Sequence, residues 1–328
     1  MKLSVVIPVY NGADFIEKSY HSILSQQIQD FELIYVDNNS QDSSVECIKK
    51  LVQLDSRVSL LAESKQGSAA ARNTGIKHAQ GDYVYIFDVD DEIYPNALNK
   101  MIQVLDAYPE TDAVFGKMVK SHQGISESLL PNDNTLKVVL KEKPYWGLKW
   151  FSNLKFVVGP PAFLYRSSVF NTIGFYNEDL RLGQDTALDI KLGMMMNIAF
   201  LDMYVYLYLK HGTSTTDTVK KKTPRAFMVW PRLVKEHLPF YLEQDTPLRF
   251  KSLLFSQLFQ SMGRQVVFTK GLKNRQDLKQ QLYHDLQAIQ IPLVIRLYLS
   301  ILVILPLESL RKVYGYYMVP YVVKQLTN

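Results

Sequence analysis

The chain has 328 residues, of which 47% are hydrophobic and 21% are charged, and this globular composition excludes the disordered and fibrous classes. Its single cysteine, Cys47, excludes an intramolecular disulfide and any zinc site built from several cysteines. The apolar run 3–7 is ended by Pro8 and is too short for a secretory signal, so we expect a cytoplasmic protein.

Charge is distributed unevenly along the chain. Residues 220–328 hold 17 Lys/Arg against 6 Asp/Glu, a net charge of +11, whereas residues 1–219 hold 20 against 26, a net charge of −6. Aliphatic and aromatic runs are concentrated in the basic part, which favours an anionic membrane surface as its partner. Paired Cys/His motifs and aromatic RNA-binding signatures are missing from the sequence, so we expect no nucleic-acid partner.

Strand and helix patterns alternate over the first 120 residues. Short apolar runs predict four strands, at 3–9, 31–36, 58–62 and 83–87. Apolar residues at helical spacing predict four helices, at 14–27, 42–54, 68–80 and 95–108. This alternation predicts an α/β fold with a mainly parallel sheet flanked by helices. Beyond the basic run 220–222 the pattern is helical to the end, so we expect two domains, 1–215 and 216–328.

Polar side chains follow three of the predicted strands directly. Their positions are Tyr10 and Asn11 after the first strand, Asp37 and Asn38 after the second, and Asp88, Asp90 and Asp91 after the fourth. Ligands of open α/β sheets bind at the carboxyl ends of the strands, so these clusters predict one site. The three aspartates repel one another, which favours a divalent cation, Mg²⁺ or Mn²⁺, held by their oxygens. The alternative is that these acids cap the following turn.

Four motifs stand in order along the chain, at 6–11, 31–37, 67–75 and 87–91. Together they resemble the family 2 glycosyltransferases over about residues 3–215. The resemblance implies the GT-A fold for nucleotide-diphospho-sugars, with the basic helical region as an appendage. It also implies inverting transfer of a sugar, usually from UDP, to a saccharide or lipid-linked acceptor. Many bacterial members assemble cell-surface polysaccharides or glycopolymers in the cytoplasm, and we expect the same here.

The resemblance assigns the donor-binding residues. Tyr10, beside Pro8, takes the base-binding position, although a turn tyrosine with a solvent-facing hydroxyl fits the same pattern. The second loop has Asp37 and Asn38 where the family has two acids. Because an amide oxygen can also accept the uracil imide N–H, both residues are candidates for reading the base. Arg72 matches the family's arginine and suits a phosphate or a base edge, with a surface ion pair as the alternative.

The resemblance also assigns the metal ligands. Asp88 and Asp90 fall on the family's Asp-x-Asp pattern, with Asp90 as the main ligand and Asp91 as its alternative. The metal would bridge the diphosphate and neutralise the leaving UDP. His211 precedes a serine-containing loop that contacts the diphosphate or the metal in the family, and imidazole suits manganese. The alternative is a structural histidine.

The general base implied by the resemblance is Asp185, which matches the Asp of a Glu-Asp pair that opens a helix. Gln184 replaces the usual Glu and keeps an oxygen that can accept the acceptor hydroxyl. A helix N-cap is the alternative role of Asp185 and is compatible with the first. Two other classes stay open. A non-catalytic nucleotide-sugar-binding module would need neither Asp185 nor the full acidic triplet, and a nucleotidyltransferase would have a Gly-rich N-terminal loop that 8–11 is not.

The segment 292–306 is apolar nearly all round, but it contains Arg296 and is bracketed by prolines. Because a spanning helix needs about 20 apolar residues, these features argue against a membrane span. A span stays open as an alternative beside two other interpretations. The helix is buried in an accessory bundle or a homo-oligomer interface, or it docks peripherally on the inner leaflet, as the basic charge and nearby tyrosines favour.

Overall fold

The computed structural model describes residues 1–127, 137–210 and 224–327. The chain divides into two compact units, Met1–Gly212 and Thr213–Asn328. The domain boundary predicted between residues 215 and 216 falls within the segment 211–223, outside the described residues, and stays a prediction.

A parallel half-sheet forms the start of the N-terminal unit, as the alternating pattern predicted. Strand β1 (Leu3–Val9) pairs in parallel with β2 (Phe31–Asp37) and with β4 (Tyr83–Ile86), and β2 pairs in parallel with β3 (Val58–Ala62). Strands β1, β2 and β4 are mostly buried, as is expected of a sheet covered on both faces, whereas only Val58 is buried in the edge strand β3.

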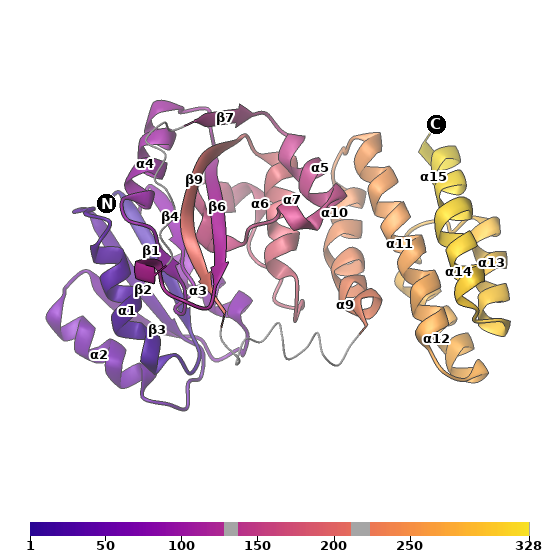
Figure 1. The fold of residues 1–328 in the computed structure, drawn as a ribbon, viewed down its shortest axis with the longest axis horizontal. Helices are drawn as coiled ribbons and strands as arrows, with labels where there is room; N and C mark the ends of the chain where they lie inside the picture. Colours follow the sequence, from indigo (N-terminus) through magenta and orange to yellow (C-terminus); the bar gives the residue numbers. More distant parts are fainter. Residues whose placement is uncertain (128–136, 211–223, 328) are drawn as a thin grey trace. The chain divides into compact units, whose positions relative to one another are not determined.

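Beyond β4 the sheet is mixed rather than parallel. Strand β8 (Phe163–Arg166) runs antiparallel to β4 and to β6 (Ala113–Ser121), and β6 is parallel to β9 (Ile198–Leu209). Strands β5 (Glu92–Ile93) and β7 (Val138–Lys141) both pair antiparallel with β9. The described strands are therefore in the order β3-β2-β1-β4-β8-β6-β9-β5, with β7 also on β9. Figure 1 shows β6 and β9 side by side.

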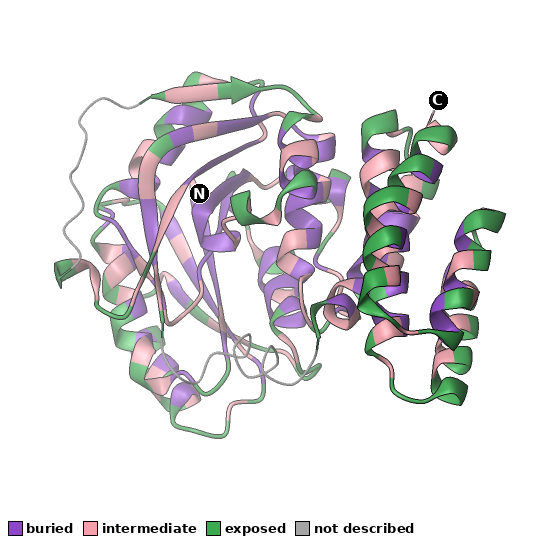
Figure 2. Ribbon diagram, turned by 45° about the vertical axis from the view of Figure 1, so that its right-hand side comes forward, coloured by how far each residue is buried: buried purple, intermediate pink, exposed green. Residues whose placement is uncertain are grey.

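Helices cover both faces of the sheet. The core on one face joins alternate residues of β1 to α1 (Ala13–Leu24), α2 (Ser44–Leu54) and α4 (Ala97–Ala107). Helix α3 (Ser68–His78) lies on the other face, where Gly75 approaches β1 so closely that a Cβ would lie 2.2 Å from Val6. Figure 2 shows the resulting band of buried residues along the strands.

The remaining helices of this unit follow β7. They are α5 (Tyr145–Ser152), α6 (Val169–Ile173) and α7 (Gln184–Met195), with 3₁₀ turns η1 (Ile125–Glu127), η2 (Leu154–Phe156) and η3 (Pro160–Ala162). Helices α5 and α7 meet at two glycines, where a Cβ on Gly147 would lie 2.5 Å from the Met194 nitrogen. Gly183 begins α7 from a left-handed conformation (φ +79°) that glycine adopts without steric cost.

The C-terminal unit is helical throughout its described part. Its elements are α9 (Arg225–Arg232), η4 (Leu233–His237), α10 (Leu238–Glu243), α11 (Leu248–Phe268), α12 (Leu272–Asp285), α13 (Leu293–Ile304), α14 (Glu308–Val313), η5 (Tyr314–Met318) and α15 (Val319–Thr327). Helix α11 is central and contacts α9, α12, α13 and α15. None of the helices in the described ranges combines the length and the apolar character that crossing a bilayer requires.

Candidate active site

The parallel strands bring the predicted donor-binding loops to one edge of the sheet. Pro8 lies in β1 opposite Val36, so Tyr10 and Asp37 end neighbouring strands. The Tyr10 side chain is 54% exposed. One Asp37 oxygen accepts the backbone N–H of Ser40 at 3.3 Å, which holds the turn after β2. At this edge the Tyr10 side chain is therefore accessible to a ligand, and the Asp37 carboxylate is held in place by the turn.

Asn38 is buried and its amide is engaged with a neighbouring loop. Its oxygen accepts the backbone N–H of Gly67 at 2.6 Å. Its nitrogen donates to the carbonyl oxygens of Glu63 and Lys65 at 2.9 and 2.8 Å. Asn38 thus fastens the 63–67 loop, which leads into α3, and the Asp37 carboxylate is the more accessible acceptor of the pair.

Arg72 is the centre of the site. This α3 residue is only 4% exposed, and its Nη2 donates to Asp88 at 2.7 Å while its Nη1 donates to Asp185 at 2.5 Å. Burial lowers the pKa of Arg72, but the two carboxylates outweigh this effect and raise the pKa well above its usual value. Because Arg72 is buried, this is not the surface pair considered from the sequence, although Asp88 and Asp185 are 29% and 36% exposed. The pairing joins three residues predicted to act in donor binding and catalysis.

A short loop after α6 contacts Arg72 and its neighbour Asn73. The Arg72 Cζ lies 5.4 Å from the centre of the Tyr176 ring. The neighbouring Asn73 donates to the Tyr176 carbonyl and accepts its N–H, both at 2.9 Å. Glu178 accepts a further bond from Asn73 at 2.8 Å and pairs with Lys65 at 2.8 Å. The sequence reasoning missed Asn73 and Tyr176, although Asn73 stands within the 67–75 motif.

The first turn of α7 presents the predicted base. Burial raises the pKa of the Asp185 carboxyl above its ordinary value, and Arg72 opposes this rise. Gln184 is mostly buried, and its nitrogen donates to the Ser68 hydroxyl at 2.9 Å, while its oxygen has no hydrogen-bond partner among the described residues. An oxygen without a partner is consistent with the predicted contact to an acceptor hydroxyl.

Asp189 lies one turn after Asp185 and was missed, although the four-residue spacing places both on one helix face. It is 1% exposed, and neither of its oxygens has a hydrogen-bond partner within the described part of the chain. Burial, and then the charge of Asp185, raise the pKa of Asp189 well above its ordinary value. Both effects disfavour the charged form of Asp189.

The acidic triplet after β4 divides into one buried and two partly exposed residues. Asp91 is 1% exposed and accepts the backbone N–H of Leu209 at 3.1 Å, which fixes the end of β9. Burial, together with Asp88 and Asp90, raises the pKa of Asp91 well above its ordinary value. Asp91 therefore has a structural contact, and Asp88 and Asp90 are the more accessible oxygens of the triplet.

A divalent cation is chemically compatible with these residues. The described residues contain no ready-made group of three or more His, Cys, Asp or Glu that could hold a metal ion, and His211 lies outside the described residues. Magnesium is commonly held by one or two carboxylates together with substrate phosphates, so Asp88 and Asp90 fit such a site. The repulsion that raises the pKa of Asp91 is the effect that a cation would relieve.

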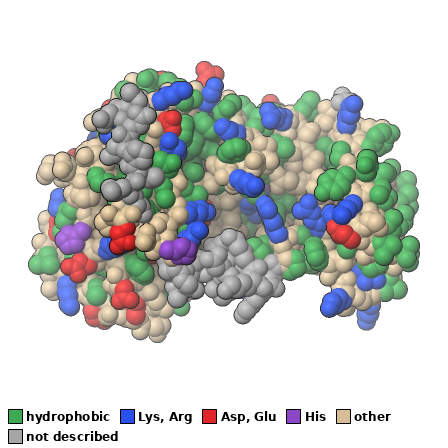
Figure 3. Space-filling model, in the orientation of Figure 1, with side chains coloured by type: hydrophobic (Ala, Val, Ile, Leu, Met, Phe, Trp, Pro, Cys, Tyr) green, Lys and Arg blue, Asp and Glu red, His purple; other side chains and the backbone are tan. Residues whose placement is uncertain are grey.

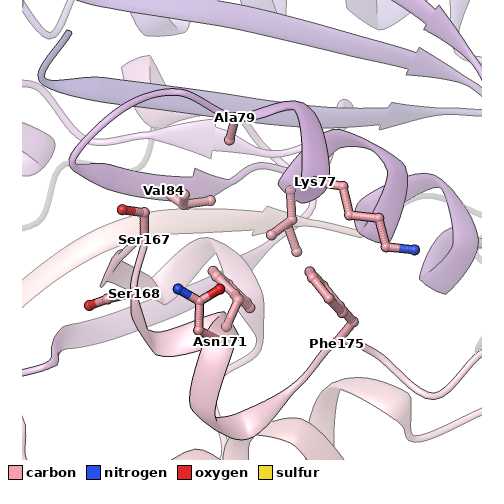
Figure 4. A pocket seen from close by; sticks show the side chains of 9 residues that line it. Lys77, Ala79, Val84, Ser167, Ser168, Asn171 and Phe175 are labelled. Atoms are coloured by element: carbon pink, nitrogen blue, oxygen red, sulfur yellow. The ribbon is translucent and has the colours of Figure 1, made fainter.

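A separate cavity of about 420 Å³ lies at the opposite end of β4 from Asp88. Its lining includes Ile76 and Lys77 from α3, Val84 from β4 and Ser167 from the turn after β8. Figure 4 shows Phe175 and Asn171 beside it. Because Val84 is near the start of β4 and Asp88 follows its end, this cavity is not part of the candidate site.

Comparison with known proteins agrees with this geometry. Residues 4–174 match the family model described as glycosyl transferase family 2. Among relatives, an uncharacterized glycosyltransferase, EpsJ, of Bacillus subtilis is 26% identical over 217 residues, which cover 66% of this chain and 63% of EpsJ. The glycosyltransferase GlyG of Streptococcus pneumoniae is 29% identical over 229 residues, covering 66% of this chain and 73% of GlyG.

Two solved structures share the fold. Residues 1–349 of Staphylococcus aureus TarS with UDP-GlcNAc superpose with a TM-score of 0.68 at 19% identity, covering 99% of this chain and 92% of that one. The mannosyltransferase PcManGT of Pyrobaculum calidifontis, with GDP-Man and Mn²⁺, gives a TM-score of 0.54 at 16% identity, covering all of this chain and 86% of that one. The sheet, its flanking helices and the acidic edge define a GT-A glycosyltransferase. The chain belongs to glycosyl transferase family 2, as the sequence motifs predicted.

Proposed function

We propose that the chain is an inverting, metal-dependent glycosyltransferase that moves a hexosyl or N-acetylhexosaminyl group from a UDP-sugar to a hydroxyl of a saccharide or lipid-linked acceptor. The observation that carries this proposal is the bridge made by Arg72. It joins Asp88, from the loop assigned to the donor, to Asp185, the residue assigned to the acceptor. Both halves of a transfer reaction thus meet at one buried guanidinium.

Asp185 is the general base in this mechanism. Its carboxylate takes the proton of the acceptor hydroxyl as the hydroxyl oxygen attacks the anomeric carbon. The new C–O bond forms on the face opposite the breaking bond to the diphosphate, so the anomeric configuration inverts and UDP leaves. Arg72 favours the ionised form of Asp185, because the guanidinium opposes the rise in pKa that burial causes.

The donor is held by the edge of the parallel half-sheet. Tyr10 and Asp37 are the residues proposed to contact the base, with Asn38 positioning the 63–67 loop beside them. Asp88 and Asp90 would hold Mg²⁺ or Mn²⁺, which when bound supplies charge neutralisation to the departing diphosphate. TarS with UDP-GlcNAc and PcManGT with Mn²⁺ share this fold, which supports a UDP donor and a divalent cation.

The biological setting of the proposal rests on the family. We assign the reaction to the cytoplasmic assembly of a cell-surface polysaccharide or glycopolymer, with the C-terminal unit available for a membrane surface or a second copy. A binding module without catalysis is the competing function. The bridge from Arg72 to a carboxylate at the head of α7 argues against it, since donor binding alone has no use for a base there.

The test is a screen of nucleotide-sugars with the full chain. UDP-glucose, UDP-galactose, UDP-GlcNAc and GDP-mannose are incubated with Mn²⁺, with Mg²⁺ or with EDTA, and release of the nucleoside diphosphate is measured with and without saccharide acceptors. We expect release from a UDP-sugar that depends on the metal and increases with the right acceptor. Tight donor binding without any release would favour the binding module instead.

A further inference from the structure

Helix α13 of the C-terminal unit is apolar on two opposite sides, and only one side is covered. Ile295, Leu299 and Leu302 are fully buried, where α13 packs on α11. The other side is an arc about 100° wide, at 100° per residue. It consists only of apolar side chains that are 39–67% exposed and that we name the α13 face: Leu293, Val294, Leu297, Ile301 and Ile304.

The polar residues of α13 lie between these two sides and contact α12. The Ser300 hydroxyl accepts from Lys279 at 3.2 Å, and the Arg296 carbonyl accepts from the Tyr283 hydroxyl at 3.4 Å. The neighbouring Val303 carbonyl accepts from Arg275 at 2.7 Å. Helix α12 therefore contacts the polar side of α13. No charged side chain of α13 lies within the α13 face.

Further exposed apolar and aromatic side chains follow the α13 face along the chain. Leu305 and Leu307 are about half exposed, and three tyrosines of η5 and α15 are 58–72% exposed: Tyr316, Tyr317 and Tyr321. In Figure 3, hydrophobic side chains gather over α13–α15. Large exposed apolar patches are uncommon on monomeric proteins and mark surfaces that bind a partner.

Charge and aromatic content indicate which partner this surface fits. Residues 224–327 hold 14 Lys/Arg against 6 Asp/Glu, a net charge of +8. Lys312 of α14 and Lys324 of α15 are exposed. Tyrosine favours the boundary between headgroups and acyl chains, and lysine favours anionic headgroups. A second copy of the unit would bring the same positive charge and be repelled, whereas an anionic lipid surface would attract it.

We propose that the α13 face docks on an anionic lipid surface. Helix α13 lies in the plane of the interface, because its 12 residues extend only about 18 Å, too short to cross the bilayer. The α13 face enters the acyl boundary, and the exposed tyrosines lie at headgroup level. This inference does not depend on the proposed sugar transfer, and its test measures no transfer.

The test is co-flotation of the full chain with two kinds of vesicle, phosphatidylcholine alone and phosphatidylcholine with 30% phosphatidylglycerol. We expect binding to the anionic vesicles that weakens between 0.1 and 0.5 M NaCl, because the charge contribution is screened. The paired substitution Leu297→Glu with Ile301→Glu places two carboxylates in the α13 face and should lower the partition coefficient at least about tenfold.

Leu242→Glu is the matched control, because Leu242 is a 49% exposed leucine of α10 in the same unit. It should float like the unmodified chain, and circular dichroism should show that both variants keep their helices. Equal flotation of the paired variant and the unmodified chain would overturn the proposal. So would failure of the unmodified chain to float, above all if it forms a dimer that the paired substitution dissociates, since the α13 face would then be an interface between copies.

Discussion

Each unit of this protein contains an almost fully buried arginine, and the two differ in how their charge is met. Arg72 in the N-terminal unit and Arg232 in the C-terminal unit are both 4% exposed. Arg72 donates from both of its terminal nitrogens to carboxylates, and its pKa is raised. Burial, and then Arg225, lower the pKa of Arg232 to about 10. Two of the Arg232 nitrogens have no hydrogen-bond partner among the residues that the structure describes.

This difference shows that a buried charge contributes to a site through the partners that surround it. A buried ion contributes little to stability by itself, because desolvation offsets its attraction to partners. At Arg72 the partners are carboxylates from two distant parts of the chain, so the charge organises a site. At Arg232 no pair of acids bonded to the guanidinium is found in the described part of the chain, and we assign no reaction to it.

The largest effect expected is on turnover. Asp185→Asn keeps a hydrogen-bond acceptor for Arg72 but removes the base, so kcat should fall by about 10²–10⁴ while UDP-sugar affinity stays close to that of the unmodified chain. Initial rates and calorimetric titration with the donor measure the two quantities. Asp179→Asn, an exposed acid of the preceding loop, is the control. Turnover within threefold of the control would remove Asp185 from the mechanism.

The next effect concerns metal binding by the acidic triplet. Asp90→Ala should weaken the metal-dependent part of UDP binding by about 10–100-fold, because a carboxylate ligand is lost. The measurement is UDP affinity with Mn²⁺ and with EDTA. Asp112→Ala, outside the acidic triplet, should keep the difference between the two conditions. If Asp90→Ala keeps it as well, Asp90 is not a ligand.

A matched pair of substitutions tests the two arginines directly. Arg72→Met should lower the free energy of unfolding by about 2 kcal/mol, less than for a fully buried pair, because Asp88 and Asp185 are 29% and 36% exposed. Arg232→Met removes a charge that burial already disfavours and should leave stability unchanged within about 1 kcal/mol or increase it. Urea unfolding monitored by circular dichroism measures both. Equal losses would mean that the two arginines are paired alike.

The smallest effect is a displacement of the pH profile. A base acts only when deprotonated, so kcat/KM should fall as the pH decreases through the folded-state pKa of Asp185, which lies above the ordinary 3.8. Because Arg72 lowers that pKa, Arg72→Gln should move the acid limb to higher pH. Arg181→Gln, an exposed arginine before α7, should not move it. An unchanged limb in Arg72→Gln would show that the two groups are not coupled in solution.

Local pattern predicted the parallel half of the fold well. The strands predicted at 3–9 and 58–62 have the observed bounds, since each is a short apolar run between turn residues. The first helix was predicted to reach residue 27 but ends at Leu24, and Gln27 adopts a positive φ of 57°. The mainly parallel sheet becomes mixed after β4, where strand pairing depends on contacts far apart in the sequence.

In the candidate site, too, sequence motifs identified single residues but not the contacts between residues far apart in the sequence. The sequence motifs identified Arg72, Asp88 and Asp185 separately, and their assigned roles stay predictions. The ion pair between Arg72 and Asp185 joins residues 113 positions apart, which no local pattern encodes. Helical spacing could have indicated Asp189, one turn after Asp185, but not its burial. The amide of Asn38 is directed to the 63–67 loop by a contact that only the folded chain creates.

The double pairing of Arg72 means that any anion bound by this arginine meets two internal anions that are already in place. Both terminal nitrogens of the guanidinium are engaged with carboxylates, and the remaining Nε is buried without a hydrogen-bond partner in the described part of the chain. Each terminal nitrogen carries a second N–H, so a phosphate that binds this arginine competes with the internal anions for its charge without having to displace them.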